Sequence, residues 1–267
     1  MHPAKRTLAI VALTTSLVSC TTQAMPASTP TQPTETLRIY ATTATLPLLI
    51  DLTTAYNGSP PVSFDTYNTN YQTMLDELRS GETPYFLTNH LENNLWAAPV
   101  GQDGIAIITH PSLSLDNLTL EQLRDIYQGR TTRWDQLNGD AANIVLFSRE
   151  AGSGTRAEFE RMVMGRRRTS TTALIASSSE NMVEQVARTP YSLGYVSIGY
   201  LNERVRPLAL DGVLPTADNI FNSLYPLRST IHIVGQQAPT GSYLVFFGWI
   251  QSPEGQAIVA QRYVPLM

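Results

Sequence analysis

The chain has 267 residues, of which 42% are hydrophobic and 15% are charged, a composition that suits a folded protein with room for two lobes of ordinary size. Its formal net charge at pH 7 is −4, which argues against nucleic acid as a partner. With one cysteine and four scattered histidines, the sequence can form no intramolecular disulfide and shows no zinc-type cluster of ligands. We therefore expect neither a metal nor another cofactor.

The N-terminal twenty residues have the pattern of an export signal. Lys5 and Arg6 form a basic start, and residues 8–18 follow as an apolar run that is too short to cross a membrane. The small residue Ser19 then precedes Cys20. This ending resembles the lipobox of bacterial lipoproteins, in which the cysteine is acylated and becomes the mature N-terminus.

We therefore predict a signal peptide over residues 1–19 and a lipid anchor at Cys20. The alternative, a cleaved signal peptide with a coincidental cysteine, stays open. Residues 20–36 are mostly Thr, Pro, Ser, Gln and Ala, a composition that cannot bury a core and predicts an extended tether. The folded body is then expected to begin at Leu37.

Short apolar runs alternate with amphipathic stretches along this body, a pattern that is typical of an α/β protein with parallel strands. Residues 37–40 predict the first strand, and residues 46–52 predict a helix after it. Residues 62–67 predict a second strand, which leads into a helix over residues 71–79.

Three predicted strand-to-helix turns share hydroxyl or amide side chains. They cover residues 42–45, 68–70 and 149–155. In open α/β sheets such turns gather at the carboxyl edge of the strands, where ligands bind. One such turn is routine helix capping, but three with the same chemistry indicate a shared site.

The third turn is the most informative part of the sequence. It lies between the apolar run 144–147 and a helical pattern that begins near Arg156. A helix start presents free N–H groups and a positive dipole end, Ser153 and Thr155 add hydroxyls, and Arg149 adds a planar cation. This combination predicts a socket for a small oxyanion, although an ordinary helix cap in a tight turn remains the plainer interpretation.

Taken together, the segments of the body resemble the substrate-binding proteins of phosphate ABC importers. The resemblance is carried by residues 41–47, 104–111, 118–129 with Trp134, 149–155, 193–196 and 225–227. It implies the type II periplasmic-binding fold, with two α/β lobes, each a mainly parallel sheet flanked by helices, and a ligand cleft between them.

The resemblance also implies that both ends of the body build the first lobe. We place residues 37–103 and 225–267 in the first lobe and residues 104–224 in the second. The strands that cross between the lobes are expected near residues 101–106 and 225–233.

Position by position, the resemblance assigns a set of residues to the anion. These are Thr43, Thr45, Leu46, Asn68 and Thr69 from the first lobe, and Arg149, Ser153, Gly154 and Thr155 from the second.

One segment departs from the family pattern. Thr88, Asn89 and His90 are candidate contacts, but His90 falls where the family has an aspartate that accepts the proton of monohydrogen phosphate. Three outcomes are open for His90: it points away into solvent, it accepts the ligand proton, or it adds positive charge. Glu92 or Glu150 can take over the acceptor role.

We therefore expect an extracytoplasmic, monomeric binding protein, not an enzyme, that delivers inorganic phosphate or a related oxyanion to an ABC permease. Sulfate and molybdate remain open as ligands, and so does a sensing lipoprotein without transport. A serine hydrolase is a remote alternative, because Ser153 lacks the G-x-S-x-G pattern and only His232 follows it.

Overall fold

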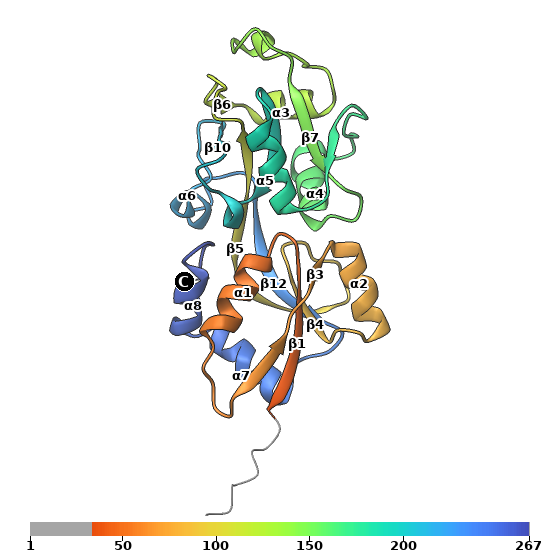
Figure 1. Ribbon diagram of the computed structural model, residues 1–267, viewed down its shortest axis with the longest axis vertical. Coiled ribbons are helices and arrows are strands. Elements are labelled where there is room, and N and C mark those ends of the chain that lie inside the picture. Colours follow the sequence, from red (N-terminus) through yellow and green to blue (C-terminus); the bar gives the residue numbers. More distant parts are fainter. Residues whose placement is uncertain (1–33, 267) are drawn as a thin grey trace, which may run out of the picture. The chain divides into compact units, whose positions relative to one another are not determined.

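A computed structural model describes residues 34–266, which cluster as one compact unit (Figure 1). The predicted signal peptide, the lipidation position Cys20 and most of the predicted tether lie outside these described residues. Within the described part of the chain, no helix combines the length and the apolar character that a membrane crossing needs.

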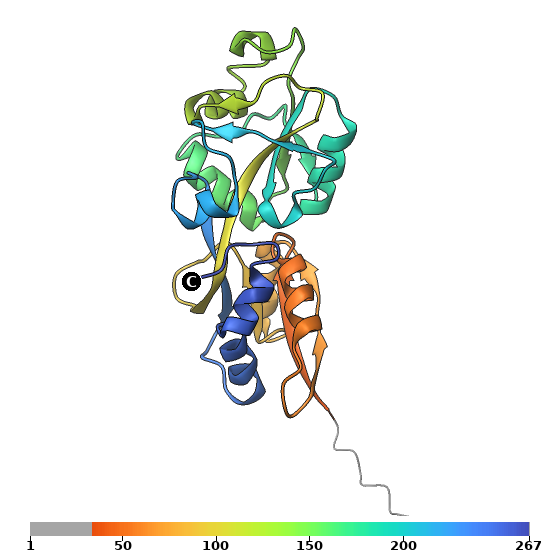
Figure 2. The ribbon, with the colours of Figure 1, turned by 90° about the vertical axis from the view of Figure 1, so that its left-hand side faces the viewer.

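The half of this unit that contains both ends of the described chain is called lobe 1. Its elements are β1 (Glu35–Thr42), α1 (Leu46–Ala55), β2 (Val62–Asp65), β3 (Asn68–Thr69), α2 (Tyr71–Ser80), β4 (Tyr85–Thr88), α7 (Gly241–Ile250) and α8 (Pro253–Val259). Strand β1 pairs in parallel with β2, β3 and β4. Helices α1, α7 and α8 pack on one core cluster and α2 on another, and Figure 2 shows α1 beside α8.

Local sequence explains these elements. In β4, Tyr85 and Leu87 face the core of α1 and α7 while Phe86 faces the core of α2, because successive strand residues point to opposite faces. Helix α2 begins at the cap Asn70, whose side chain accepts the N–H of Thr73 at 3.0 Å. The predicted turn over residues 68–70 is therefore shorter than expected, since Asn68 and Thr69 form β3 by pairing with the end of β1.

The other half of the unit is called lobe 2. Its elements are β6 (Asn117–Leu118), α3 (Leu120–Tyr127), a 3₁₀ helix (Trp134–Leu137), β7 (Val145–Arg149), α4 (Gly154–Phe159), a π-helix (Glu160–Met164), β8 (Leu174–Ala176), α5 (Ser179–Arg188), β9 (Ser192–Ser197), a 3₁₀ helix (Ile198–Tyr200), β10 (Arg206–Pro207), β11 (Ala209–Leu210) and α6 (Ala217–Phe221). Strand β7 pairs in parallel with β8 and β9. Buried side chains of α3, α4 and α5 cover this part of the sheet.

Two strands join the lobes, as Figure 1 shows: β5 (Trp96–Thr109) and β12 (Arg228–Gly235). They pair in antiparallel fashion from Trp96 with Gly235 to Gly104 with Arg228. The sheet runs in the order β2-β1-β4-β12-β5-β9-β7-β8. The expected sheets of the two lobes are thus joined into one continuous sheet, because β5 is long enough to pair with β12 in lobe 1 and with β9 in lobe 2. Positions 104 and 225, predicted as lobe boundaries, fall inside β5 and just before β12.

This topology sets the place of the site. The parallel strands β1 and β7 end at Thr42 and Arg149, and the two turns that follow these ends face each other from different lobes. Carboxyl ends of parallel strands are where ligands bind in α/β sheets. The fold therefore brings the first and the third predicted turns together.

Candidate functional site

Arg149 is the centre of the candidate site and is completely buried, with 0% of its surface exposed. Its Nε and Nη2 donate to the two carboxylate oxygens of Glu150 at 2.8 and 2.9 Å, and its Nη1 donates to the hydroxyl of Ser179 at 3.2 Å. The second N–H of Nη2 reaches the hydroxyl of Thr43 in lobe 1, at 3.0 Å. Because a guanidinium has five N–H groups, one N–H on Nη1 has no hydrogen-bond partner among the described residues.

The turn after Arg149 supplies further donors. Ser153 caps helix α4, and its Oγ accepts the N–H of Arg156 at 3.2 Å. Gly154 and Thr155 are the first two residues of this helix, so their N–H groups have no partner inside the helix. All of Ser153, Gly154 and Thr155 are buried. The turn therefore places two free N–H groups at buried positions, and their role in binding an anion stays a prediction.

The first-lobe turn differs from the prediction in one respect. Thr45 was expected to offer its hydroxyl to the anion, but this hydroxyl is fully buried and donates to the carbonyl oxygen of Leu87 at 2.9 Å. The reason is the parallel pairing of β1 with β4, which brings Leu87 beside the turn. What this turn offers instead is the N–H of Leu46, the first residue of α1, which has no intrahelical partner.

Asn68 and Thr69, which are predicted to contact the anion from lobe 1, lie next to this turn. The N–H of Thr43 donates to the carbonyl oxygen of Thr69 at 3.1 Å, which links the two segments. Both side chains of β3 are half-buried. The structure thus brings Asn68 and Thr69 to the same edge of the sheet as Leu46.

The lobes touch around these groups. Thr43 makes two contacts with lobe 2. Its hydroxyl accepts from Arg149, and its carbonyl oxygen accepts the hydroxyl hydrogen of Tyr200 at 2.6 Å. The N–H of Gln72 in α2 donates to the carbonyl oxygen of Gly152 at 3.1 Å. These three hydrogen bonds bring the turn after β1 and the turn after β7 together at the contact between the lobes.

His90 lies at a contact between the lobes, and its role toward a ligand stays a prediction. Its Nδ1 lies 2.7 Å from Oε1 of Glu158 in α4, and its ring packs edge-on against Tyr71 with centroids 4.7 Å apart. Glu158 also accepts from Arg161 at 2.6 Å. Burial raises the pKa of Glu158, but the hydrogen bonds from His90 and Arg161 outweigh it and hold this pKa below its ordinary value. His90 thus links lobe 1 to helix α4 of lobe 2.

Both glutamates considered as substitute acceptors pair with arginines. Glu150 uses both carboxylate oxygens on Arg149. Glu92 lies at the surface with Arg79, at 3.5 Å.

The neighbours of His90 are more informative. The hydroxyl of Thr88 donates to the carbonyl oxygen of His90 at 3.0 Å, so it shapes the turn. Asn89 is only 2% exposed, and its Nδ2 donates to Oδ2 of Asp103 at 3.2 Å. The Oδ1 of Asn89 is buried and has no hydrogen-bond partner among the described residues. This oxygen lies 3.6 Å from the point that a Cβ on Gly154 would occupy.

Asp103 is the residue that the sequence interpretation missed. It is completely buried in β5, where its Oδ1 accepts the hydroxyl of Ser197 at 2.8 Å and the N–H of Ile198 at 3.2 Å. Burial raises the pKa of Asp103 to about 7, although these hydrogen bonds and the one from Asn89 pull it down. The signal was available, because Asp103 is the one charge within the run 100–108.

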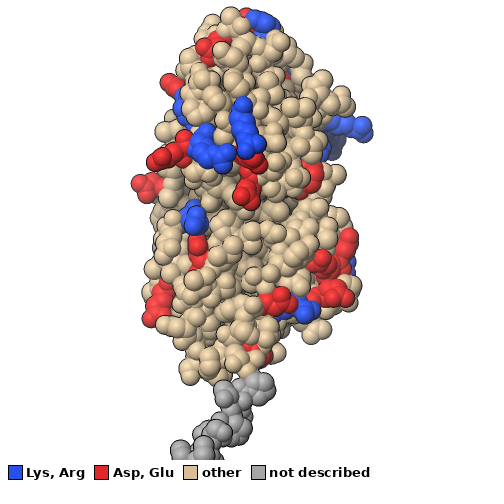
Figure 3. Space-filling model, viewed as in Figure 1, with Lys and Arg blue, Asp and Glu red and all other residues tan. Residues whose placement is uncertain are grey.

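Three further observations describe the surroundings of the site. No group of three or more metal-binding side chains occurs among residues 34–266. In the same part of the chain, no histidine is hydrogen-bonded to Ser153, whose oxygen accepts from Arg156. On the face seen in Figure 3, basic and acidic side chains alternate, and no broad basic surface suited to nucleic acid is present there.

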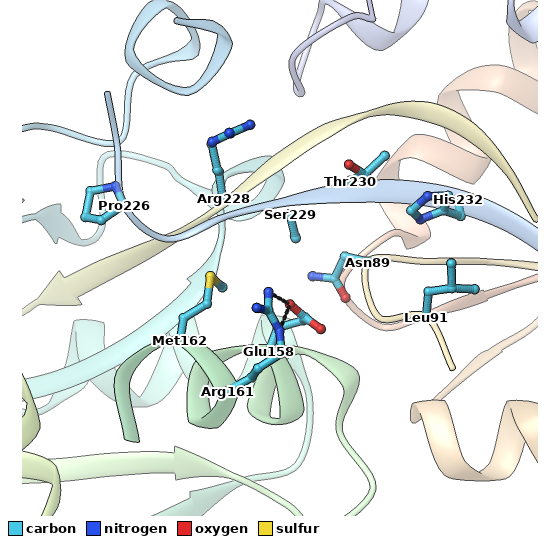
Figure 4. Close-up of a pocket in the computed structure, with 10 residues that line it drawn as sticks. All are labelled: Asn89, Leu91, Glu158, Arg161, Met162, Pro226, Arg228, Ser229, Thr230 and His232. Carbon is cyan, nitrogen blue, oxygen red and sulfur yellow. Dashed lines mark hydrogen bonds and ion pairs between the residues drawn. The ribbon is translucent and has the colours of Figure 1, made fainter. Parts of the chain in front are cut away.

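A cavity of about 490 Å³ adjoins the site (Figure 4). Its wall is formed by Asn89, Leu91, Glu158, Arg161, Met162, Pro226, Arg228, Ser229, Thr230 and His232. Figure 4 shows the ion pair between Glu158 of helix α4 and Arg161 of the π-helix that follows, with Asn89 between this pair and strand β12. Asn89 thus lines the cavity and also lies close to Gly154, where α4 begins.

Comparison with known proteins agrees with this fold. Residues 26–254 match the family described as the PBP superfamily domain. The phosphate-binding protein PstS of Bacillus subtilis is 28% identical over 166 residues, which are 61% of this chain and 55% of that protein. PstS of Borreliella burgdorferi is 24% identical over 172 residues, 60% of this chain and 62% of that protein. The matches thus span little more than half of the length of these two relatives.

Two solved structures extend the comparison. A protein from Clostridium perfringens, assigned as a phosphate ABC transporter substrate-binding protein and solved with bound phosphate, is 28% identical with a TM-score of 0.83, covering 87% of this chain and 100% of that one. An ABC-type phosphate transport receptor from Vibrio cholerae is 25% identical with a TM-score of 0.70, covering 85% of this chain and 99% of that one. These structures share the two-lobed α/β architecture. Since the family match covers most of its length, the chain belongs to the PBP superfamily.

Proposed function

We propose that this protein is an extracytoplasmic binding protein that captures phosphate and delivers it to an ABC importer. The observation that carries the proposal is the hydrogen bond from buried Arg149 in lobe 2 to Thr43 in lobe 1, which brings a helix start of each lobe into the same part of the molecule. Arg149 and the free N–H groups of Gly154 and Thr155 come from lobe 2, and the N–H of Leu46 comes from lobe 1. The relatives and the matching crystal structures support the choice of phosphate.

The chemistry of these groups suits a tetrahedral oxyanion. A dehydrated anion needs many fixed donors around its oxygens, together with a full positive charge. Arg149 is that charge, held in place by Glu150 and Ser179, so little side-chain entropy is lost when a ligand arrives. No group in this arrangement is poised as a nucleophile, which favours binding over catalysis.

Titration calorimetry with phosphate, sulfate and molybdate on the protein freed of bound anion tests the proposal. We expect one phosphate per chain, bound at least about 100-fold more tightly than sulfate, because phosphate alone carries a proton at neutral pH and can donate as well as accept hydrogen bonds. Sulfate binding as tight as phosphate binding would refute the assignment of phosphate.

Capture between two lobes also fits delivery to a partner. Arg149 and Leu46 can surround one anion only when the lobes meet. The closed form therefore distinguishes the ligand-bound protein from the empty one. We propose that a monomer in this closed form is what the membrane permease of the importer recognises.

We further propose that Cys20 carries the lipid that holds the protein at the outer face of the cell membrane. The proposal comes from the basic, apolar and small-residue pattern that precedes Cys20. In cells that produce the full-length chain, Cys20→Ser is expected to shift the protein from the membrane fraction to the soluble extracytoplasmic fraction, as read by fractionation. An unchanged membrane fraction would show that the chain is held in another way.

A further inference from the structure

His90 and Glu158 are the one pair of ionisable side chains that joins the two lobes within residues 34–266. His90 lies between β4 and β5 in lobe 1, and Glu158 lies in α4 of lobe 2, 68 positions further along the chain. Nδ1 of His90 and Oε1 of Glu158 are 2.7 Å apart. A contact of this kind exists only while the lobes are closed, so it can act on ligand binding without touching the ligand.

The charge on Glu158 makes this contact a strong one. Its side chain is only 8% exposed, and its carboxyl group is ionised at neutral pH, since its pKa lies below the ordinary value. Arg161 donates to Oε2 from Nε at 3.1 Å and from Nη2 at 2.6 Å, so His90 alone serves Oε1 among the described side chains. Hydrogen bonds to a charged group are about twice as strong as those between neutral groups.

The protonation of the His90 ring follows from its partner. An ionised carboxylate can only accept hydrogen bonds, so Nδ1 of His90 carries a hydrogen whether the ring is neutral or charged. The contact therefore persists in both charge states of the ring.

Two cavities border this contact. One of about 490 Å³ has Glu158 and Leu91 in its wall (Figure 4), and another of about 370 Å³ has His90 and Ala157 in its wall. Each wall thus combines residues of both lobes. Since the lobe surfaces do not touch across these cavities, His90 and Glu158 join the lobes at a place where the surrounding packing is incomplete.

Helix α4 connects this contact to the anion site. Glu158 lies about one helical turn beyond Gly154, the first residue of α4, whose free N–H is predicted to bind the anion. A Cβ on Gly154 would lie only 3.3 Å from the Cβ atoms of His90 and Tyr71, so a glycine at this position lets lobe 1 approach the helix start closely. Holding Glu158 against His90 therefore also holds the start of α4 against lobe 1.

Building on the proposed function, we propose that His90 and Glu158 form a latch, a contact that stabilises the closed form and slows the release of bound phosphate. The pair acts on the equilibrium between the open and closed forms. Breaking it weakens every anion that the site takes by the same factor, whereas the loss of a direct ligand contact changes the preference among anions.

The substitution His90→Leu removes the donor from lobe 1. We expect stopped-flow measurements to show a phosphate dissociation rate that is at least about 10-fold higher than that of the parent protein, with an association rate within about 3-fold. In calorimetry, the preference for phosphate over sulfate should stay within about 3-fold of the parent value. An unchanged dissociation rate, or a larger change of the preference, would overturn the latch.

His90→Asn tests whether the hydrogen bond or the ring matters. The amide Nδ2 of asparagine is bonded to Cγ, as Nδ1 of histidine is, so this variant can still donate to Glu158. Its dissociation rate should stay within about 3-fold of the parent rate. A rate as high as that of His90→Leu would show that packing of the ring on Tyr71 is what counts, and the latch would be wrong.

His110→Leu is the matched control, because it makes the same chemical change at a histidine of lobe 2 whose Nδ1 contacts Ser112 beside it. Its dissociation rate should equal that of the parent protein. If His110→Leu accelerates release as much as His90→Leu does, the effect does not come from the contact between the lobes.

Glu158→Leu breaks the same contact from lobe 2 and keeps the test open if one variant does not fold. The double variant His90→Leu/Glu158→Leu should release phosphate no faster than the faster single variant, because both substitutions remove one interaction. Rates that multiply would overturn the latch. If the parent protein binds neither anion, the proposed function fails; if it binds phosphate and both single variants release it at the parent rate, only the present inference fails.

Discussion

Replacing Arg149 by alanine is expected to weaken phosphate binding by at least about 3 kcal/mol, or at least about 100-fold. The substitution removes the one full positive charge of a site that is shielded from water, where Coulomb interactions are stronger than at the surface. It also leaves Glu150 without its partner, so a carboxylate that was neutralised now repels the anion. Calorimetry with phosphate measures the effect.

Arg188→Ala is the matched control for this experiment, because it changes the net charge equally at an exposed position on α5, where Arg188 pairs only with Glu184. Its phosphate affinity should equal that of the parent protein. Circular dichroism melts of both variants verify that they fold. If the Arg149→Ala protein folds and binds phosphate at full strength, Arg149 does not belong to the site.

The stability of the ligand-free protein is expected to fall as the pH rises from about 4 to about 7, by as much as about 4 kcal/mol from Asp103 alone. Burial raises the pKa of Asp103 from 3.8 to about 7 in the folded protein. Between these values the folded state keeps a proton that the unfolded state has lost, so each step up in pH favours unfolding. Urea denaturation at a series of pH values measures this loss.

Asp103→Asn removes the titrating group and should flatten the pH profile of stability relative to the parent protein. Asp76→Asn is the control, because its side chain is 64% exposed and the substitution should leave the profile of the parent protein unchanged. A profile that is identical for the parent protein and the Asp103→Asn variant would contradict the effect of burial on this carboxyl group.

The sequence allowed the local structure to be predicted well. The strand over residues 37–40, the helix that begins at Leu46 and the helix over 71–79 all occur within the bounds of β1, α1 and α2. Side-chain periodicity and capping residues encode such elements over short distances. The resemblance to known binding proteins supplied the two-lobed fold, and the solved structures confirm it.

The site was less predictable, because its contacts join segments that lie far apart in the chain. Thr45 carries the residue type expected for an anion contact, but its hydroxyl is taken by Leu87, which only the pairing of β1 with β4 reveals. His90 and Glu158 meet only because the two lobes do. Asp103 lies in a strand with apolar neighbours, and its contact with Asn89, fourteen positions earlier, follows only from the fold.

The pairing of β5 with β12 has a mechanical consequence. The two lobes are parts of one sheet, so they can separate by bending a two-stranded ribbon without breaking its ladder of hydrogen bonds. The register of the β5–β12 pair shifts between Ile231 and His232, and such irregularities bend a strand locally. Such a connection allows the two lobes to open and close while the paired strands keep their register. Arg149 can therefore meet Thr43 in the same alignment in each closed form.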